Sequence, residues 1–120
     1  MQDTFSKNVK VFYPRFKKKE LVEKLTQAFR EISRQVRISD AMLFGSYAKA
    51  TNTAFSDIDI LVVTEDNKDE VYSVCWDIIG IPETELHIYT GEEIKIMKGT
   101  DNLFLKEVER NGVKLLIPPR

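Results

Sequence analysis

Cysteine and long apolar runs are the scarcest features of this 120-residue sequence, and each scarcity removes a class of protein. The lone Cys75 can form no internal disulfide, and one thiol cannot build a cysteine metal site. No apolar run approaches the ~20 residues that a membrane-spanning helix needs. The N-terminal segment lacks the apolar core of a secretory signal, because basic residues interrupt it. We therefore expect a cytoplasmic protein without membrane segments.

The composition is that of an ordinary globular domain. Hydrophobic residues make up 42% and charged residues 31% of the chain, and the net charge is −1. The length suits a single domain over residues 1–120 with one hydrophobic core. Residues 1–13 show no strong periodicity and are predicted to be a loose arm or a short strand.

The charge is unevenly distributed. Residues 1–30 hold eight basic and three acidic residues, a local net charge of +5, with aromatic residues between them. This segment is either a phosphate or RNA contact surface or the solvated first turns of a helix whose aromatic residues pack on the core. The pI of 5.9 argues against a nucleic-acid-binding protein.

Hydrophobic periodicity divides the chain into short helices and strands. We expect Cys75 and Trp76 to lie in the core. Gly80 is expected to end a helix, and Thr90 to Glu93 resembles a capped helix start. The pattern indicates an α/β (α+β) two-layer fold with a mixed sheet and helices mainly on one face. The predicted helices cover 14–35, 69–79, 94–97 and 102–110, the predicted strands cover 36–44, 57–63, 85–89 and 113–117, and 47–50 is a helical turn.

The segment from Asp57 to Val63 is the clearest strand. Alternate side chains of a strand point to opposite faces, so Asp57 and Asp59 share one face. Leu61 and Val63 lie further along that same face, which indicates that both faces are buried there. The opposite face carries Ile58, Ile60 and Val62.

The aspartate pair is chemically distinctive. Residues at i and i+2 on a strand have Cα atoms roughly 6.6 Å apart, so the carboxylates of Asp57 and Asp59 can converge on one cation. Two like charges on an apolar strand are unfavourable unless something positive lies between them. Mg²⁺ suits such a pair, because it prefers a few carboxylates together with phosphate oxygens and water.

A turn that can hold phosphate precedes the aspartate pair. The predicted strand ending at Phe44 runs into Gly45 and Ser46, where glycine lets the backbone approach a ligand closely. The serine hydroxyl and the N–H groups of a following helical turn can point at an anion. Lys49 can add positive charge. A phosphate cradle beside paired carboxylates is what a metal-bridged triphosphate requires.

At these residues the chain resembles the nucleotidyltransferase superfamily that includes DNA polymerase beta. It is most similar to the minimal nucleotidyltransferases, which are often encoded beside a HEPN-domain partner. The resemblance implies transfer of a nucleoside monophosphate, AMP from ATP, to an acceptor hydroxyl with two Mg²⁺ ions. The similarity lies in the segments 44–48, 56–62, 104–108 and 115–116, and the nucleotide-binding residues that it implies are Gly45, Ser46, Lys49 and Ser56.

The family fold also places an acidic residue on the next strand. The best match is Glu85, which together with Asp57 and Asp59 completes the implied catalytic and metal-binding set. Glu83 has the same phase and is the alternative, and a third possibility is that Glu85 is only a solvated strand residue. His87 shares the face of Glu85. It is a metal ligand, a proton carrier or, as is commoner for a lone histidine, a packed strand residue.

Two departures bear on phosphate binding. The group commonly has Arg-Gly where Lys49 and Ala50 stand here. Lysine keeps the charge but loses the bidentate fork, and alanine restricts the backbone if that position needs a positive φ.

The chain is too short to carry a separate acceptor-binding domain. The acceptor site must therefore come from a second copy in a homodimer, from a partner protein, or from the acceptor itself. The resemblance points to a HEPN partner in a toxin–antitoxin pair. Two other classes stay open: an inactive module of the same fold that binds and masks a partner, and an RNA-binding domain that uses the basic N-terminal segment.

Overall fold

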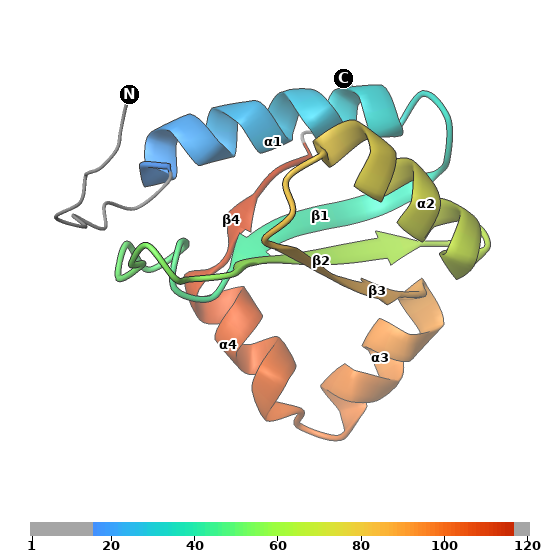
Figure 1. Ribbon diagram of the computed structural model, residues 1–120. Coiled ribbons are helices and arrows are strands. Elements are labelled where there is room, and N and C mark those ends of the chain that lie inside the picture. The colour runs from blue at the N-terminus through green and yellow to red at the C-terminus, as the bar shows by residue number, and fades with distance from the viewer. Residues whose placement is uncertain (1–15, 117–120) are drawn as a thin grey trace, which may run out of the picture.

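Four helices and four strands make up residues 16–116, the part of the chain that the computed structural model describes (Figure 1). The predicted arm at 1–13 and residues 117–120 lie outside the described residues. The helices are α1 (Lys18–Ile32), α2 (Lys68–Ile79), α3 (Gly91–Gly99) and α4 (Leu103–Asn111). The strands are β1 (Ile38–Phe44), β2 (Ile58–Thr64), β3 (Thr84–Tyr89) and β4 (Val113–Lys114).

The four strands form one mixed sheet in the order β3-β2-β1-β4. β1 is antiparallel to both β2 and β4, whereas β2 and β3 are parallel. A parallel pair needs a crossover connection, and α2 supplies it between β2 and β3. The predicted class, an α/β fold with a mixed sheet, is confirmed. β4 is shorter than the expected strand at 113–117.

Helices cover both faces of the sheet, which differs from the expectation that they lie mainly on one face. In Figure 1, α1 and α2 lie over one face, and α3 and α4 lie over the other. The larger apolar cluster joins α1 and α2 to Ile58, Ile60 and Val62 of β2. The second cluster joins Leu61 and Val63 to α4. These two side chains on the aspartate face need an apolar cover, so a second helical layer is required.

Local capping residues mark several helix ends close to where the sequence predicted them. Gly80 ends α2 in the left-handed conformation, with φ of 61°. Thr90 and Glu93 form a capping box at the start of α3. Asn102 caps α4 by accepting a hydrogen bond from the Leu105 amide at 2.9 Å. The first helix begins at Lys18, later than the predicted start at 14.

The two neighbours Cys75 and Trp76 differ in burial. Cys75 is fully buried, and burial raises the pKa of its thiol to about 12, so the thiol stays protonated. Trp76 was expected in the core, but it is 38% exposed and its ring stacks with that of Tyr72 at 6.3 Å. Trp76 lies one helical position after Cys75, so its side chain points about 100° away from the direction of the core.

None of the helices within residues 16–116 is long and apolar enough to cross a membrane.

Candidate active site

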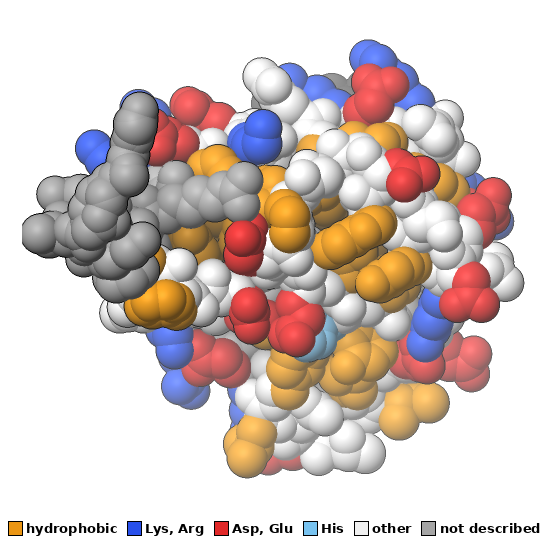
Figure 2. Space-filling view, viewed as in Figure 1, with side chains coloured by type: hydrophobic (Ala, Val, Ile, Leu, Met, Phe, Trp, Pro, Cys, Tyr) orange, Lys and Arg blue, Asp and Glu red, His pale blue; other side chains and the backbone are white. Residues whose placement is uncertain are grey.

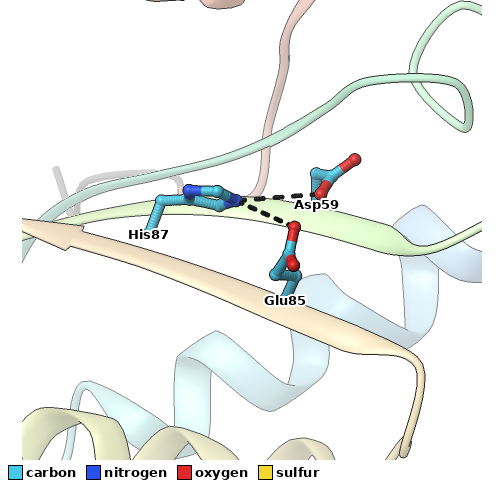
Figure 3. A group of neighbouring side chains, drawn as sticks. All are labelled: Asp59, Glu85 and His87. Atoms are coloured by element: carbon cyan, nitrogen blue, oxygen red, sulfur yellow. Dashed lines mark ion pairs between the residues drawn. The ribbon is translucent and has the colours of Figure 1, made fainter.

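The parallel pairing of β2 and β3 brings two predicted site residues together. In the register of the two strands Asp59 lies opposite Glu85, and Leu61 lies opposite His87. Alternate residues share a face, so Asp59, Glu85 and His87 all point to the same side of the sheet (Figure 3). Glu83, the alternative third carboxylate, precedes β3, and its carbonyl oxygen accepts a hydrogen bond from the Ile58 amide at 3.0 Å.

The three side chains form a compact cluster. His87 Nε2 lies 3.5 Å from Glu85 Oε1 and 3.7 Å from Asp59 Oδ1. One ligand atom from each residue lies within 4.8 Å of the others. Asp59 is mostly buried, with 23% of its side chain exposed, whereas Glu85 is 60% exposed. Figure 2 shows the acidic side chains and the histidine at an open surface beside hydrophobic side chains. The cluster can therefore be reached from solvent.

The electrostatics of this cluster disfavour an isolated negative charge on Asp59. The pKa of Asp59 is raised, first by burial and then by a hydrogen bond with Glu85 and by the negative charge of Glu85. The charge of Asp57 adds to this effect, and the charge that His87 can carry opposes it. A bound cation would reverse the balance, because it stabilises the ionised carboxylates.

Gly45 lies against the carboxylate of Asp59. Its φ is 78°, and a Cβ built on it would lie 2.5 Å from Asp59 Oδ2. Both the backbone conformation and the space therefore require glycine at this position. Sequence reasoning expected this glycine to let the backbone approach a ligand. In the structure, the group that approaches the backbone is the aspartate itself.

Backbone hydrogen bonds close the turn that follows Gly45. The Lys49 amide donates to the Gly45 carbonyl at 3.2 Å, and the Thr51 amide donates to the Ser46 carbonyl at 2.9 Å. The segment is thus the helical turn that was predicted, and Ser46 lies at its start, where amides lack intrahelical partners. Ala50 has a φ of 58°, in the left-handed region that favours glycine, so the alanine does restrict the backbone at this position.

Lys49 is paired in this structure. Its Nζ lies 3.4 Å from Oε2 of Glu107, on α4. The Asn111 side chain donates a hydrogen bond to the same Glu107 oxygen at 2.8 Å. The expected role of Lys49 at a phosphate stays a prediction, and this ion pair would have to open for Lys49 to reach one.

The two residues before β2 are Ser56 and Asp57, at the N-terminal end of the strand. Asp57 is exposed and directly precedes the strand. The hydroxyl of Ser56 accepts a hydrogen bond from the Thr53 amide at 2.8 Å, which closes the polar loop. Asp57 belongs to the same local charge group as Asp59, because its charge contributes to the raised pKa of Asp59.

Aromatic side chains hold the imidazole of His87. Its ring centroid lies 5.1 Å from that of Phe44 and 5.6 Å from that of Phe104. Nε2 is buried and has no hydrogen-bond partner among residues 16–116. These contacts could not be predicted from the sequence, because Phe44, His87 and Phe104 come from three separate elements.

The residues of the cluster fit a divalent cation. Asp59 and Glu85 offer carboxylate oxygens, and His87 offers a buried nitrogen that lacks a hydrogen-bond partner. Buried polar atoms are nearly always satisfied, and a cation bound between this nitrogen and the two carboxylates would satisfy it. Asp57 is not part of this group of ligand atoms, although its charge contributes to the raised pKa of Asp59.

This combination of strand, turn and paired carboxylates defines a class of protein. Residues 23–118 match the model of the family described as polymerase beta, nucleotidyltransferase, and the chain belongs to that family. The chain is also 34% identical over 90 residues to a protein of Methanocaldococcus jannaschii named as a candidate protein adenylyltransferase. That match covers 75% of this chain and 77% of the relative.

A solved structure shares the fold. A candidate nucleotidyltransferase from Sulfolobus solfataricus superposes with a TM-score of 0.55 at 17% identity, over 82% of this chain and 81% of the other. The family membership supports nucleotidyltransferase activity, and the expected nucleotidyltransferase fold is confirmed.

Proposed function

We propose that this protein transfers AMP from ATP to a hydroxyl group of a protein and releases pyrophosphate. The observation that carries the proposal is the pairing of Asp59 with Glu85 across β2 and β3, with the Gly45 backbone against Asp59. A protein acceptor is consistent with the name of the Methanocaldococcus relative. It is also consistent with the exposure of Glu85, since a bulky acceptor needs an open site.

Each site residue has a proposed role. Gly45 and Ser46, with Lys49 and Ser56 nearby, bind the β- and γ-phosphates of ATP. Asp57 and Asp59 would hold the Mg²⁺ on the triphosphate side, and Glu85 together with Asp59 would hold the ion on the acceptor side. When bound, the two ions would supply positive charge that stabilises the negative charge developing in the transition state.

The reaction forms one bond and breaks one. The acceptor oxygen attacks the α-phosphorus, a new phosphorus–oxygen bond forms, and the bond from the α-phosphorus to the bridging oxygen breaks. Pyrophosphate leaves with that electron pair. The hydroxyl proton passes to Glu85 or to solvent beside it, because Glu85 is the exposed carboxylate of the cluster. Asp59 is more buried and keeps its orientation through the Gly45 contact.

The acceptor is proposed to be a partner protein. Residues 16–116 form a single sheet with its covering helices, and we therefore place the acceptor hydroxyl on a second polypeptide. The family resemblance makes a HEPN-domain toxin our first candidate, with this chain as the antitoxin that modifies it. A homodimer that presents a hydroxyl of its own second copy is the alternative arrangement.

Label transfer tests the activity directly. The protein is incubated with a divalent cation and a protein extract, using ATP labelled either at the α- or at the γ-phosphate. We expect a protein to acquire label from the α-phosphate only, and we expect Asp57→Ala/Asp59→Ala to abolish the transfer. Label from the γ-phosphate, or full transfer by the double variant, would contradict the proposal.

Calorimetry separates ATP binding from transfer. ATP should bind in the presence of Mg²⁺, and the binding should be lost in Asp57→Ala/Asp59→Ala.

The second candidate function is that of an inactive module that binds and masks a partner protein. The ion pair of Lys49 with Glu107 favours it, because the ammonium group of Lys49 is already paired with a carboxylate. That module would bind its partner equally well with or without Asp57 and Asp59, and no label would transfer.

A further inference from the structure

His87 is the one nitrogen donor in a cluster that otherwise offers oxygen. Its Nε2 is buried, lies within 3.7 Å of an oxygen of Asp59 and within 3.5 Å of an oxygen of Glu85, and has no hydrogen-bond partner among the described residues. In Figure 3 the ring edge that carries Nε2 points between the two carboxylates. A charged pair with the carboxylates would need a protonated imidazole, whereas a neutral imidazole presents a lone pair to an ion.

We propose that His87 is a metal ligand, so that the ion on the acceptor side is a first-row transition-metal dication such as Mn²⁺, bound by Asp59, Glu85 and His87. This inference deepens the proposed function, because it names the ion at that same site. The triphosphate-side ion at Asp57 and Asp59 has only oxygen ligands and remains suited to Mg²⁺.

The spacing of the donor atoms suits a small ion. Adjacent ligands of an octahedral ion at ~2.1 Å lie about 3.0 Å apart, and those of a tetrahedral ion about 3.4 Å apart. The separations from His87 Nε2 to the two carboxylates are 3.5 and 3.7 Å, so they need to close by about 0.1–0.3 Å for a tetrahedral ion and by about 0.5–0.7 Å for an octahedral ion. Such a change lies within the reach of side-chain rotation, especially for the exposed Glu85.

The chemistry of the donor set decides between ions. Mg²⁺ prefers oxygen ligands and retains its water, whereas imidazole nitrogen is a good ligand for first-row transition metals. The aromatic rings of Phe44 and Phe104 hold the imidazole in place. A fixed nitrogen ligand is consequently a constant part of the site, and it adds more affinity for Mn²⁺ than for Mg²⁺.

Electron paramagnetic resonance tests the ligand itself. The probe is Mn²⁺ added to the full chain without a histidine tag. Since His87 is the one histidine of the sequence, any imidazole ¹⁴N coupling to bound Mn²⁺ has a single source. We expect the pulsed spectrum of the wild type to show this coupling. It should disappear in His87→Phe and in His87→Gln.

The affinities supply a second readout. His87→Phe keeps the aromatic packing and removes the nitrogen, and His87→Gln keeps polarity. We expect both variants to bind Mn²⁺ ~10-fold more weakly or worse, with Mg²⁺ affinity, measured by competition, changed less than ~2-fold. Unchanged melting temperatures would show that the variants are folded, and a loss of fold in one variant leaves the other as the test.

The outcomes separate this inference from the proposed function. One outcome is that Mn²⁺ binds to the wild type without ¹⁴N coupling and that the binding is lost in Asp59→Asn. This result would overturn the role of His87 but would leave the carboxylate site and the proposed reaction intact. An equal loss of Mn²⁺ and Mg²⁺ affinity in the His87 variants would also overturn the inference, because it would indicate only a structural role. If the wild type bound neither ion, both proposals would fall.

Discussion

Gly45 brings the backbone of the turn at residues 45–51 against the carboxylate of Asp59. The glycine has a φ of 78°, and its α-carbon side faces Asp59 Oδ2, with no room for a methyl group. The orientation of Asp59 is thus set by main chain rather than by a flexible side chain. A displaced turn would displace the carboxylate with it.

Gly45→Ala should damage both stability and the site. The new methyl group would lie 2.5 Å from Asp59 Oδ2, and the residue would adopt a φ that alanine disfavours. We expect a loss of ~1–3 kcal/mol in the free energy of unfolding, measured by urea denaturation, and weaker divalent-ion binding by calorimetry.

Gly80→Ala is the matched control for that substitution. Gly80 also has a positive φ, of 61°, but no atom lies within 4 Å of the position of its Cβ. Its substitution should cost ~1 kcal/mol of stability and leave ion binding unchanged. If Gly45→Ala bound ions as tightly as Gly80→Ala, the proposed coupling between Gly45 and Asp59 would be incorrect.

Ala50→Gly should stabilise the protein. Ala50 has a φ of 58°, and the left-handed region costs a non-glycine residue ~1–2 kcal/mol. Glycine removes this cost but adds entropy to the unfolded chain, so the net gain in unfolding free energy should be ~0.5–1 kcal/mol. Urea denaturation measures this free energy. A destabilised variant would show that the Ala50 methyl group stabilises the turn by more than its positive φ costs.

At the residue scale the sequence identified the types of chemistry but not the contacts. Glycine, paired aspartates and a lysine in one short segment indicated a phosphate and metal site. The ion pair of Lys49 with Glu107 and the aromatic contacts of His87 could not be predicted, because they join residues far apart in the chain. The positive φ at Ala50 could not be predicted from the residue itself, because alanine rarely adopts that conformation.

At the scale of elements, α4 contacts the turn at residues 45–51 that follows β1. It supplies Glu107, which holds Lys49, and Leu105 and Val108, which pack on the aspartate face of the sheet. The helix therefore has two roles, one in the core and one at the edge of the site. These roles can be separated, because Glu107 is partly exposed and the apolar residues are buried.

Glu107→Gln should strengthen triphosphate binding. The substitution removes the charge that pairs with Lys49 and frees the ammonium for a phosphate. Exposed ion pairs are worth ~0.2–1 kcal/mol, so we expect a gain of up to ~5-fold in ATP affinity and little change in stability. Calorimetry with Mg²⁺ measures the affinity. Glu109→Gln, which breaks the pair of Glu109 with Lys98, should leave the affinity unchanged.

Element boundaries followed from the sequence more closely than the arrangement of the elements did. Capping residues such as Asn102 and Gly80 act locally, so they fixed the helix ends in the sequence as in the structure. The sheet order and the division of the helices between two faces depend on long-range packing. Buried Leu61 and Val63 pointed to apolar packing on the aspartate face, but not to which helices would provide it.

The parallel register was the feature of the site that only the structure could supply. A shift of β3 by one residue would turn Glu85 to the opposite face. Glu85 and Glu83 have the same phase in the strand, so the sequence favoured Glu85 but kept Glu83 as the alternative. In the sheet, Glu85 lies opposite Asp59, whereas Glu83 precedes the strand.

At the scale of the whole molecule, the carboxylate cluster makes stability depend on pH and on metal. The folded-state pKa of Asp59 is raised by burial and by Glu85, so the folded protein binds this proton more tightly than the unfolded chain does. The contribution of Asp59 is therefore favourable at pH below its ordinary pKa and is lost as the pH rises through the folded value.

Asp59→Asn should consequently raise the melting temperature of the metal-free protein at pH 7, by a few degrees. The variant should also lose the stabilisation that Mn²⁺ or Mg²⁺ gives the wild type. Thermal unfolding at pH 5 and pH 7, with and without the ion, measures both effects. A lower melting temperature of the metal-free variant at pH 7 would contradict the electrostatic account.

Asp66→Asn provides a control of opposite sign. The pKa of Asp66 is lowered by hydrogen bonds from the backbone and side chain of Arg37, so its charge is favourable in the folded state. Its contribution is present at neutral pH and is lost as the pH falls through the folded pKa. We therefore expect Asp66→Asn to lower the melting temperature at pH 7, without any effect on the response to metal.

The order of the strands has a consequence for synthesis on the ribosome. β4 pairs with β1, and α4 covers Leu61 and Val63, so the end of the described chain completes both the sheet and the second apolar cluster. A nascent chain that ends before α4 would expose the aspartate face, together with its apolar side chains, to other unfinished proteins. Translation must therefore pass α4 before the carboxylate cluster gains its apolar support, which ties the appearance of a working site to a nearly finished chain.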